Sequence, residues 1–369
     1  MENINVGITE MHGIAQEYSK FPPEGVVYSE VFPNDKYTKR IFRSAAKGVY
    51  AYVNAPNHDI IEAPLFPVLT NQPLIYTPAH FSSAGAFDFF GVPTPRFIKM
   101  MFAKRFLERD NFKKLIFKSE FGRKSLLEYG GIDCRSILDK TDVIYPCIRP
   151  IPDTMIEYRN NKINLLFVGE FLRKGGANVV DAFLRLNQEF DDLTLTICSS
   201  RSIQSKNTPL INEYLKKIDN CKNITMEFVD RERLIGEIIP QSDIYLCPTY
   251  QESWGFSIQE AMAYGRAVIA TDISAIPEMI ENNKSGILIP IKDHPFIKKS
   301  KGYIVNDIPD DFMNYLTEEV YKSTKRLIED ISFRKSLGQE ALRTSRTKFC
   351  IDKRKSKILK IYKDALNSR

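Results

Sequence analysis

The sequence contains little of what marks a secreted or membrane-spanning protein. It has six cysteines in 369 residues and no Cys-x-x-Cys pair, too sparse a set for a disulfide framework. No apolar run approaches the ~20 residues that span a bilayer. The first residues, MENINVGITEMHG, lack the basic-then-apolar order of a signal peptide. We therefore expect reduced thiols and a cytoplasmic protein.

Several catalytic signatures are also absent. No group of His, Cys and carboxylate residues has the spacing of metal ligands, and there is no Asp-x-Asp pair. The sequence has neither a Gly-x-Ser-x-Gly elbow nor a Walker A loop. Its first strand region lacks Gly-x-Gly-x-x-Gly, which weighs against a dehydrogenase. We therefore set aside serine hydrolase and P-loop chemistry and expect no metal site.

The remaining composition is that of an ordinary globular protein, with 43% hydrophobic and 27% charged residues. The length is enough for about two domains of ~100–200 residues each. Apolar strand-like runs alternate with helical patterns, which is typical of α/β domains with parallel sheets. The expected strands are residues 3–8, 25–31, 73–78, 114–119, 163–169, 193–199, 224–229, 244–249, 267–272 and 286–290.

A segment with three prolines, Tyr145–Asn161, is a candidate linker between the two halves. We expect a Rossmann-like, acceptor-side domain over residues 1–150 and a Rossmann-like, donor-side domain over 151–345. A basic C-terminal helix should follow over residues 346–369 and pack on the first domain. Parallel sheets bind ligands beyond the carboxyl ends of their strands, and the cleft between such domains is a common place for a small-molecule site.

The net charge of +6 is unevenly distributed. Residues 321–369 hold 15 Lys or Arg against five Asp or Glu, and residues 95–125 hold ten against three. A basic amphipathic helix in the second stretch could lie on an anionic membrane, or it could be a domain helix with its apolar side in the core. No nucleic-acid-binding signature accompanies either stretch. The apolar residues at helical spacing there are Phe97, Met101, Phe102, Phe106 and Leu107.

The most informative stretch is PTYQESWGFSIQEAMAYGRAVI, residues 248–269. A helix is expected to begin near Gly255 and end at Gly265. Glu252 and Glu260 stand just before this helix and about two turns into it. Gly255 lets a ligand approach the backbone closely, and the unpaired N–H groups of a helix start suit a phosphate. The structural alternatives are a helix-capping carboxylate for Glu252 and a solvated helix face for Glu260.

A second strand-to-helix junction, FVGEFLRKGG at residues 167–176, carries two adjacent cations, Arg173 and Lys174. They could hold a diphosphate through charge-assisted hydrogen bonds. Together the two junctions suit a nucleotide diphosphate whose leaving group gains negative charge in the transition state.

These motifs resemble the nucleotide-binding half of retaining family-4 (group 1) glycosyltransferases. That family has the α/β GT-B fold, two facing Rossmann-like domains with parallel sheets and a C-terminal helix that crosses back to the first domain. Its pattern is a Gly-Arg…Lys-Gly loop followed by Glu-x7-Glu within E-x-x-G-x-x-x-x-E-A-x-A-x-G-x-P-V-I-A. This chain departs from it at Glu170, where the family usually has Arg. It matches at Glu252, Gly255, Glu260, Ala261, Ala263, Gly265, Val268, Ile269 and Ala270.

The resemblance implies roles for the residues of the second domain. Glu260 should bond the ribose of a sugar nucleotide, and Glu252 should contact the donor sugar. The backbone near Gly255 should lie close to the phosphates, and the selectivity for base and sugar should come from loops near residues 199–201, 229–230 and 249–251. The implied catalytic residues are Glu252, Arg173 and Lys174, and the implied donor-binding residues are Glu260, Gly255, Phe256 and Ser257.

In the first half the resemblance is weaker. The family often has a histidine beside the donor sugar, and His80 in IYTPAHFSSAG is the best candidate. The alternative for His80 is a structural loop histidine. His12 and Gly13 follow the first strand, where the family usually has a Gly-Gly loop near donor and acceptor.

We therefore expect a retaining, metal-independent, hexosyltransferase-type enzyme that moves a sugar from a nucleotide-diphosphate sugar to an acceptor hydroxyl. The expected context is surface-polysaccharide or lipid-linked glycan synthesis, with no cofactor beyond the donor substrate. The alternatives are a GT-B phosphorylase or sugar-phosphate synthase, and a non-catalytic partner subunit that binds sugar nucleotide or membrane. The expected partners are the donor, a glycan or lipid-linked acceptor and an anionic membrane surface at the inner face of the plasma membrane, but no nucleic acid. The crossing helix should place the basic tail beside residues 95–125, as one continuous basic face.

Overall fold

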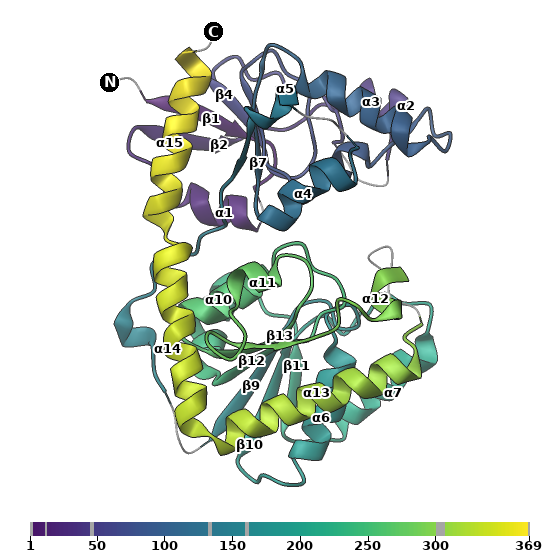
Figure 1. The fold of residues 1–369 in the computed structure, drawn as a ribbon, viewed down its shortest axis with the longest axis vertical. Helices are drawn as coiled ribbons and strands as arrows, with labels where there is room; N and C mark the ends of the chain where they lie inside the picture. Colours follow the sequence, from purple (N-terminus) through teal and green to yellow (C-terminus); the bar gives the residue numbers. More distant parts are fainter. Residues whose placement is uncertain are drawn as a thin grey trace. The chain divides into compact units, whose positions relative to one another are not determined.

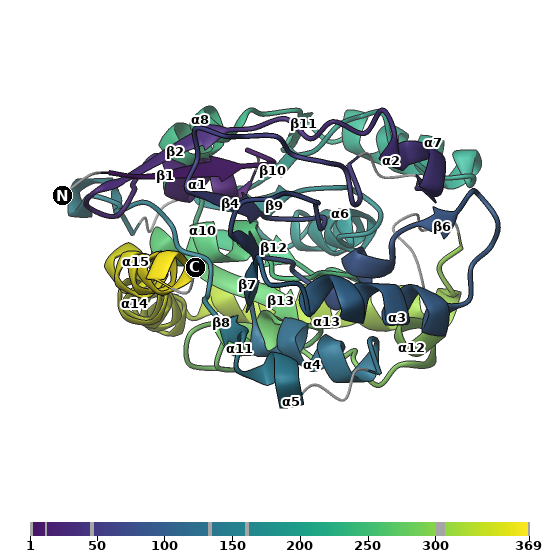
Figure 2. The same cartoon turned by 90° about the horizontal axis from the view of Figure 1, so that it is seen from above.

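The computed structural model describes residues 3–11, 13–44, 48–131, 135–158, 162–299 and 307–367. The chain divides into two compact domains, which are drawn in Figures 1 and 2. The first domain consists of Met1–Arg149 together with Phe349–Arg369, and the second consists of Pro150–Lys348. Each domain contains one six-stranded sheet in which all neighbouring strands are parallel. In the described part of the chain, no helix has the length and apolarity needed to cross a membrane.

The first sheet contains the four strands expected in this half of the sequence and two further strands, β4 and β8. In sheet order the strands are β2 (Val26–Glu30), β1 (Ile4–Ile8), β4 (Ile60–Ala63), β5 (Leu74–Tyr76), β7 (Phe112–Phe117) and β8 (Thr141–Val143). The sequence pattern missed β4 because Glu62 interrupts its apolar run, although this carboxylate is completely buried. It missed β8 because this short edge strand is only partly buried. A separate antiparallel pair joins β3 (Phe42–Arg43) to β6 (Asp88–Phe89).

The helices of the first domain pack on both faces of its sheet. They are α1 (Ile14–Ser19), α2 (Thr38–Ile41), η1 (Phe81–Gly85), α3 (Arg96–Leu107), α4 (Glu120–Glu128), α5 (Arg135–Leu138) and α15 (Ile351–Asn367). The last of these, α15, returns from the end of the chain to this domain, as the GT-B resemblance implies. Ile358 and Tyr362 of α15 are completely buried in its core.

The expected continuous basic face is wrong for α3 and α15, because these two helices lie on opposite faces of the first sheet. Side chains alternate between the two faces of a strand. Ile60 and Ile116 pack in a core cluster with α15, whereas their neighbours Ile61 and Leu115 pack in a different cluster with α3. Figures 1 and 2 show the two helices on different sides of this sheet. Basic residues on α3 and α15 therefore cannot join into one surface.

The helix expected around residues 97–107 is present as α3, but only part of its apolar pattern faces the core. Phe106 and Leu107 are buried, whereas Phe97 and Met101 are exposed. The interpretation as a domain helix with its whole apolar side in the core is therefore wrong for Phe97 and Met101. Helical spacing groups apolar residues but cannot decide which of two apolar sides meets the sheet.

The second sheet consists of the six strands expected from the sequence. In sheet order they are β11 (Ile224–Glu227), β10 (Leu193–Cys198), β9 (Ile163–Val168), β12 (Ile244–Cys247), β13 (Ala267–Thr271) and β14 (Ile287–Ile289). Every residue of β12 and β13 is buried, as in a parallel sheet covered on both faces. Apolar runs of this kind predicted β12 and β13, whereas the apolar/polar alternation of Leu193–Cys198 predicted β10.

The helices of the second domain cover both faces of its sheet. They are η2 (Asp153–Met155), α6 (Gly176–Leu186), α7 (Thr208–Asp219), α8 (Arg231–Arg233), the π-helical turn η3 (Leu234–Ile238), α9 (Ile239–Gln241), α10 (Phe256–Ala263), α11 (Ile276–Met279), α12 (Pro295–Lys299), α13 (Asp310–Glu329) and α14 (Ile331–Lys348). Residues 349–350 separate α14 from α15. These two helices belong to different domains, because the division falls after Lys348.

Candidate functional site

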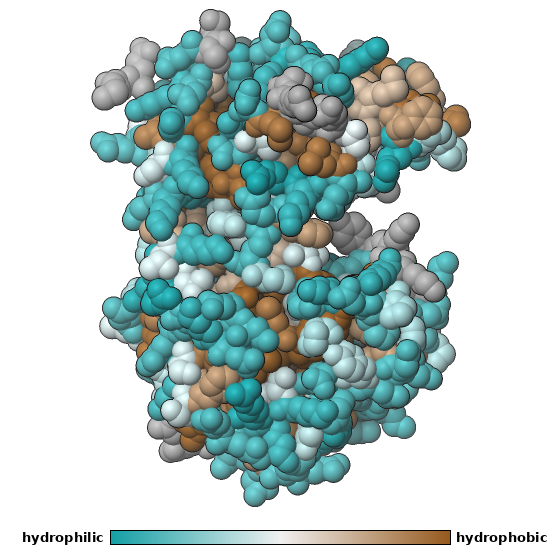
Figure 3. Space-filling model, in the orientation of Figure 1, coloured by the Kyte–Doolittle hydropathy of each residue, from teal (hydrophilic) through white to brown (hydrophobic). Residues whose placement is uncertain are grey.

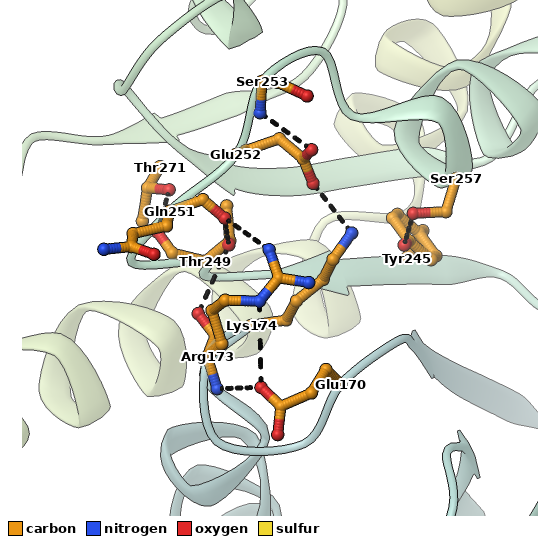
Figure 4. Close-up of polar contacts among 10 residues, drawn as sticks. All are labelled: Glu170, Arg173, Lys174, Tyr245, Thr249, Gln251, Glu252, Ser253, Ser257 and Thr271. Atoms are coloured by element: carbon orange, nitrogen blue, oxygen red, sulfur yellow. Dashed lines mark hydrogen bonds and ion pairs between the residues drawn. The ribbon is translucent and has the colours of Figure 1, made fainter. Parts of the chain in front are cut away.

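Two loops meet at the carboxyl edge of the second sheet. One follows β9 and leads into α6, and the other follows β12 and leads into α10. Strands β9 and β12 are adjacent and parallel in the sheet. The loops that follow them therefore lie side by side. The backbone N–H of Tyr250 donates to the carbonyl of Arg173 at 2.9 Å, which ties the loops together. Both sequence junctions thus contribute to one site, drawn in Figure 4.

Glycines are required where each loop enters its helix. Gly175 has φ +79°, and a Cβ there would lie 2.2 Å from the carbonyl oxygen of Pro248. Gly255 has φ +97°, and a Cβ there would lie 2.9 Å from Cε of Met279. Both positions have a left-handed backbone that favours glycine, and at Gly175 the backbone of Pro248 also leaves no space for a side chain. The helix start expected near Gly255 is confirmed, since α10 begins at the next residue.

Lys174 and Glu252 form an ion pair that joins the two loops. The ammonium Nζ lies 2.7 Å from the carboxylate Oε2, with 14% and 11% of the side chains exposed. Burial alone would raise the pKa of Glu252, but the charge and hydrogen bond of Lys174 hold it below its ordinary value. Burial alone would lower the pKa of Lys174, but Glu252 raises it above its ordinary value. Both groups are therefore ionised at neutral pH.

Glu252 is not the cap of α10. Its other oxygen, Oε1, accepts the backbone N–H of Ser253 at 2.9 Å, and α10 has no side-chain cap hydrogen bond. The helix-capping alternative for Glu252 is therefore wrong. Its carboxylate instead lies in the loop, bonded to Lys174 (Figure 4).

Arg173 lies between a carboxylate and a backbone carbonyl of the same two loops. Glu170 accepts the backbone N–H of Arg173 at 2.7 Å, and its carboxylate lies 3.9 Å from Nε of that side chain. The guanidinium also approaches the carbonyl oxygen of Gln251 at 3.5 Å. Glu170, which stands where the family usually has Arg, thus holds the turn that presents Arg173.

Glu260 is almost completely buried on α10, with 2% of its surface exposed. It forms an ion pair with Arg231, whose guanidinium also lies 4.6 Å from the ring centroid of Phe256. The alternative of a solvated helix face is therefore wrong for Glu260. A buried carboxylate that is paired with one cation is positioned before any ligand arrives.

Arg231 was missed by the sequence interpretation. It is the first residue of α8, a three-residue helix after β11, and belongs to no motif. Asp230 caps this helix by accepting the N–H of Arg233 at 3.0 Å. The one available signal was its place just after a parallel strand, where polar residues reach the ligand-binding edge of the sheet.

The start of α10 brings Phe256 and Ser257 to the same region. Tyr245 donates its hydroxyl hydrogen to Oγ of Ser257 at 2.7 Å, which fixes this side chain in the first turn (Figure 4). The ring of Phe256 lies under the guanidinium of Arg231. All seven expected residues of the second domain thus lie on the two loops and the first turns of α10, and their roles stay predictions.

A pocket of about 370 Å³ opens beyond the ends of β9, β10 and β11. Its lining includes Gly169, Ser199 and Val229, with exposed Phe228 among them. Two of the three loops expected to select the donor, near residues 199–201 and 229–230, therefore border one cavity. Across the described residues, no group of three or more His, Cys, Asp and Glu side chains is placed to hold a metal ion.

His80 has a structural partner within the first domain. It is the N-cap of η1, and its Nδ1 accepts the backbone N–H of Ser82 at 3.1 Å. Burial lowers the pKa of its imidazole, with the charge of Glu128 acting in the opposite direction. This arrangement fits the structural alternative, and a role beside the donor sugar stays a prediction. Gly13 precedes α1 with φ +55°, and His12 lies outside the described residues.

Residues 162–300 match the protein family described as glycosyl transferases group 1. The match lies within the second domain and contains the junctions that carry Lys174 and Glu252. It supports the group 1 resemblance that these motifs imply.

Two curated relatives are similar over part of the chain. Over 158 residues the chain is 29% identical to the alpha-maltose-1-phosphate synthase of Mycolicibacterium smegmatis. This aligned stretch covers 40% of this chain and 39% of that protein. Over 137 residues it is 26% identical to an uncharacterized 41.2 kDa protein in the cps region of Klebsiella pneumoniae. This stretch covers 37% of this chain and 35% of that protein. The chain thus spans less than two fifths of the length of each.

Solved structures match almost the whole chain. A glycosyltransferase from Rickettsia africae covers 99% of both chains with a TM-score of 0.65 at 18% identity. Alr3699/HepE from Anabaena, solved in complex with UDP-glucose, covers 98% of this chain and 100% of its own with a TM-score of 0.62 at 13% identity. Because the sequence identities are below 25%, the structural similarity establishes the fold alone. It confirms the expected GT-B architecture.

Proposed function

We propose that the protein is a glycosyltransferase that moves a sugar from a nucleotide-diphosphate sugar to an acceptor hydroxyl. One observation carries the proposal: the Lys174–Glu252 and Arg231–Glu260 pairs occur in one domain, within the stretch that matches group 1 glycosyl transferases. A carboxylate for sugar hydroxyls, another for ribose and cations for a diphosphate are the groups that such a donor needs.

The ion pairs prepare these groups for the donor. Glu252 is ionised, so it can accept hydrogen bonds from sugar hydroxyls but cannot donate a proton. Because Lys174 is already held by Glu252 at 2.7 Å, its ammonium needs little reorganisation to meet a diphosphate. Charge placed before the reaction stabilises a transition state better than charge that must move. Arg173, supported by Glu170, would add a second cation.

We propose that the transfer retains the configuration of the sugar and needs no metal or cofactor. The acceptor oxygen would bond to the anomeric carbon on the face from which the diphosphate departs. The bond between that carbon and the phosphate oxygen would break, and the acceptor proton would pass to the departing phosphate. Lys174 and Arg173 would stabilise the charge that develops on this leaving group.

We propose the pocket beside Phe228 as the seat of the base, and uridine diphosphate sugars as the first donors to test. An exposed aromatic face can stack on a planar base, and the structurally similar Anabaena protein binds UDP-glucose. A thermal-shift screen with UDP-, GDP- and ADP-sugars would identify the donor, because a ligand that binds the native state raises the melting temperature. No stabilisation by any common sugar nucleotide would favour a non-catalytic subunit that binds something else.

The decisive variant is Glu260→Ala. Loss of the ribose contact should lower turnover by about a hundredfold or more, equivalent to about 2.7 kcal/mol, and should abolish the thermal shift. The matched control is Glu213→Ala on α7, whose carboxylate is exposed and pairs with Lys217. Normal turnover of the Glu260 variant would contradict the proposed donor site.

The acceptor proposed is a surface polysaccharide or lipid-linked glycan. A sugar-phosphate synthase or phosphorylase is the second candidate, favoured by the similarity to an alpha-maltose-1-phosphate synthase. Supplying inorganic phosphate or a sugar phosphate with the identified donor distinguishes the two. Formation of a sugar phosphate would support the second candidate, whereas transfer to glycan hydroxyls alone would support the first.

A further inference from the structure

Helix α3 has apolar side chains on two sides, although the core of the first domain covers one. Met100, Ala103, Phe106 and Leu107 are buried in that core. On the other side, Phe97 and Met101, one turn apart, are 66% and 58% exposed, and Ile98 lies beside them. Packing within the domain explains why the buried side of α3 is apolar, but it does not explain the exposed apolar residues on the other side.

The exposed apolar surface continues onto the segments next to α3. Phe90 and Val92, in the loop after β6, are 65% and 63% exposed. The backbone N–H of Phe90 donates to the carbonyl of Ile41 at 2.8 Å, so the end of α2 adjoins this loop. Figure 3 shows apolar residues gathered over this part of the first domain. We call the whole set the α3 patch, and its members are Ile41, Phe90, Val92, Phe97, Ile98 and Met101.

Basic residues dominate the segments that carry the patch. Residues 35–44 and 88–109 contain nine Lys or Arg and three Asp or Glu, an excess as large as the net charge of the whole chain. Arg43 and Lys99 line a pocket of about 350 Å³ beside Gly91. Lys99 also forms an ion pair with Asp88 at 2.8 Å, which holds its ammonium at the pocket wall. Asp88 also lines this pocket, so the positive charge of the region comes from its other basic residues, to which an anionic surface is complementary.

We propose that the α3 patch docks on the surface of a bilayer that contains anionic phospholipid. Exposed Phe and Met side chains next to Lys and Arg suit the boundary between acyl chains and headgroups. None of the described helices can span a bilayer, so the domain would lie on the surface. A second copy of the chain fits less well, because two equally basic patches repel each other. The proposal does not depend on the proposed transfer reaction, since it is tested without any donor.

The test is flotation of the full chain with two kinds of vesicle, one of phosphatidylcholine and one of equimolar phosphatidylcholine and phosphatidylglycerol. We expect recovery with the anionic vesicles and little with the neutral ones, with a decrease as salt is added. The double variant Phe97→Ser/Met101→Ser should weaken binding by about tenfold or more. The matched control Leu127→Ser changes a similarly exposed leucine on α4 and should bind normally.

Two double variants that remove positive charge distinguish binding through the α3 patch from binding through the basic tail. Arg43→Gln/Arg105→Gln should weaken binding to anionic vesicles, whereas Lys357→Gln/Lys360→Gln on α15 should not, since α15 covers the other face of the sheet. If the apolar double variant lowers the melting temperature, Met101→Gln alone replaces it. Equal recovery with both vesicles, or normal binding of the patch variants, would overturn the proposal. A patch variant that changes only the oligomeric state would assign the patch to a second copy instead.

Discussion

The two domains share an architecture but place their charged side chains in different surroundings. In the second domain, Lys174 and Glu252 form their ion pair at a loop edge with part of each side chain exposed. In the first domain, the Glu62 carboxylate on β4 is completely buried and accepts hydrogen bonds from Tyr18 at 2.6 Å and Tyr362 at 2.5 Å. A ligand could compete for the first carboxylate but cannot reach the second. The comparison separates a charge that a ligand can reach from a charge that stabilises the fold.

The buried charge of the first domain joins α15 to the rest of that domain. Arg354 of α15 lies 3.8 Å from Glu62 and stacks 3.6 Å from the ring centroid of Tyr18. Its neighbour in the same cluster, Tyr362, bonds both Glu62 and Tyr28. Burial alone would lower the pKa of Arg354, but the surrounding phenols and Glu62 raise it above the ordinary value. These contacts explain why the end of the chain belongs to the first domain.

The largest expected effect is on turnover, from Lys174→Ala. Loss of the cation that we propose to face the diphosphate should lower turnover by about a thousandfold, or about 4 kcal/mol. The free energy of unfolding should fall by about 2 kcal/mol, because Glu252, with 11% of its side chain exposed, loses its cation but keeps some contact with water. Steady-state kinetics with the identified donor and urea unfolding give the two quantities. The control Lys217→Ala removes a half-buried ion pair with Asp181 and should leave turnover unchanged.

The reverse pattern is expected for Glu62→Gln in the first domain. Removing this charge leaves Arg354 buried without its carboxylate, which should lower the free energy of unfolding by about 3 kcal/mol. Limited proteolysis should then release α15 faster than in the unchanged protein. Tyr362→Phe removes one neutral donor from the same cluster and should cost about 1 kcal/mol. If urea unfolding shows Glu62→Gln to be no less stable than the control Glu30→Gln, the buried cluster does not hold α15.

The sequence predicted the second domain better than the first domain, for physical reasons that particular residues show. Apolar runs such as those of β12 and β13, and the apolar/polar alternation of β10, predicted the strands of the second sheet, whereas the charge of Glu62 concealed β4. The Glu-x7-Glu spacing brought Glu252 and Glu260 to attention, but their partners lie far away in sequence. Nothing in a single sequence links Arg231 to Glu260. Periodicity also could not show that Phe97 and Met101 face away from the core.

A smaller effect than those of Lys174→Ala and Glu62→Gln is expected on the pH dependence of stability, and it concerns Lys118 of the first domain. Lys118, at the end of β7, donates to the carbonyl of Pro64 at 3.2 Å. Burial lowers the pKa of Lys118 to about 8, with Glu62 and Glu10 acting in the opposite direction. In the unfolded chain the ordinary pKa is 10.5, so the unfolded state binds more protons between these values. This contribution to stability therefore rises with pH across that window.

Lys118→Met removes the titrating group and should remove this rise. From pH 8 to pH 10 the unfolding free energy of the unchanged protein should rise by about 2 kcal/mol more than that of the variant. Lys114→Met, on the same strand, corrects for the general effect of removing an ammonium. A difference that stays constant with pH would show that Lys118 is hydrated. The first domain would then, like the loops that carry Lys174 and Glu252, keep a charged group within reach of a ligand. Lys118 would become a candidate for contact with the proposed acceptor.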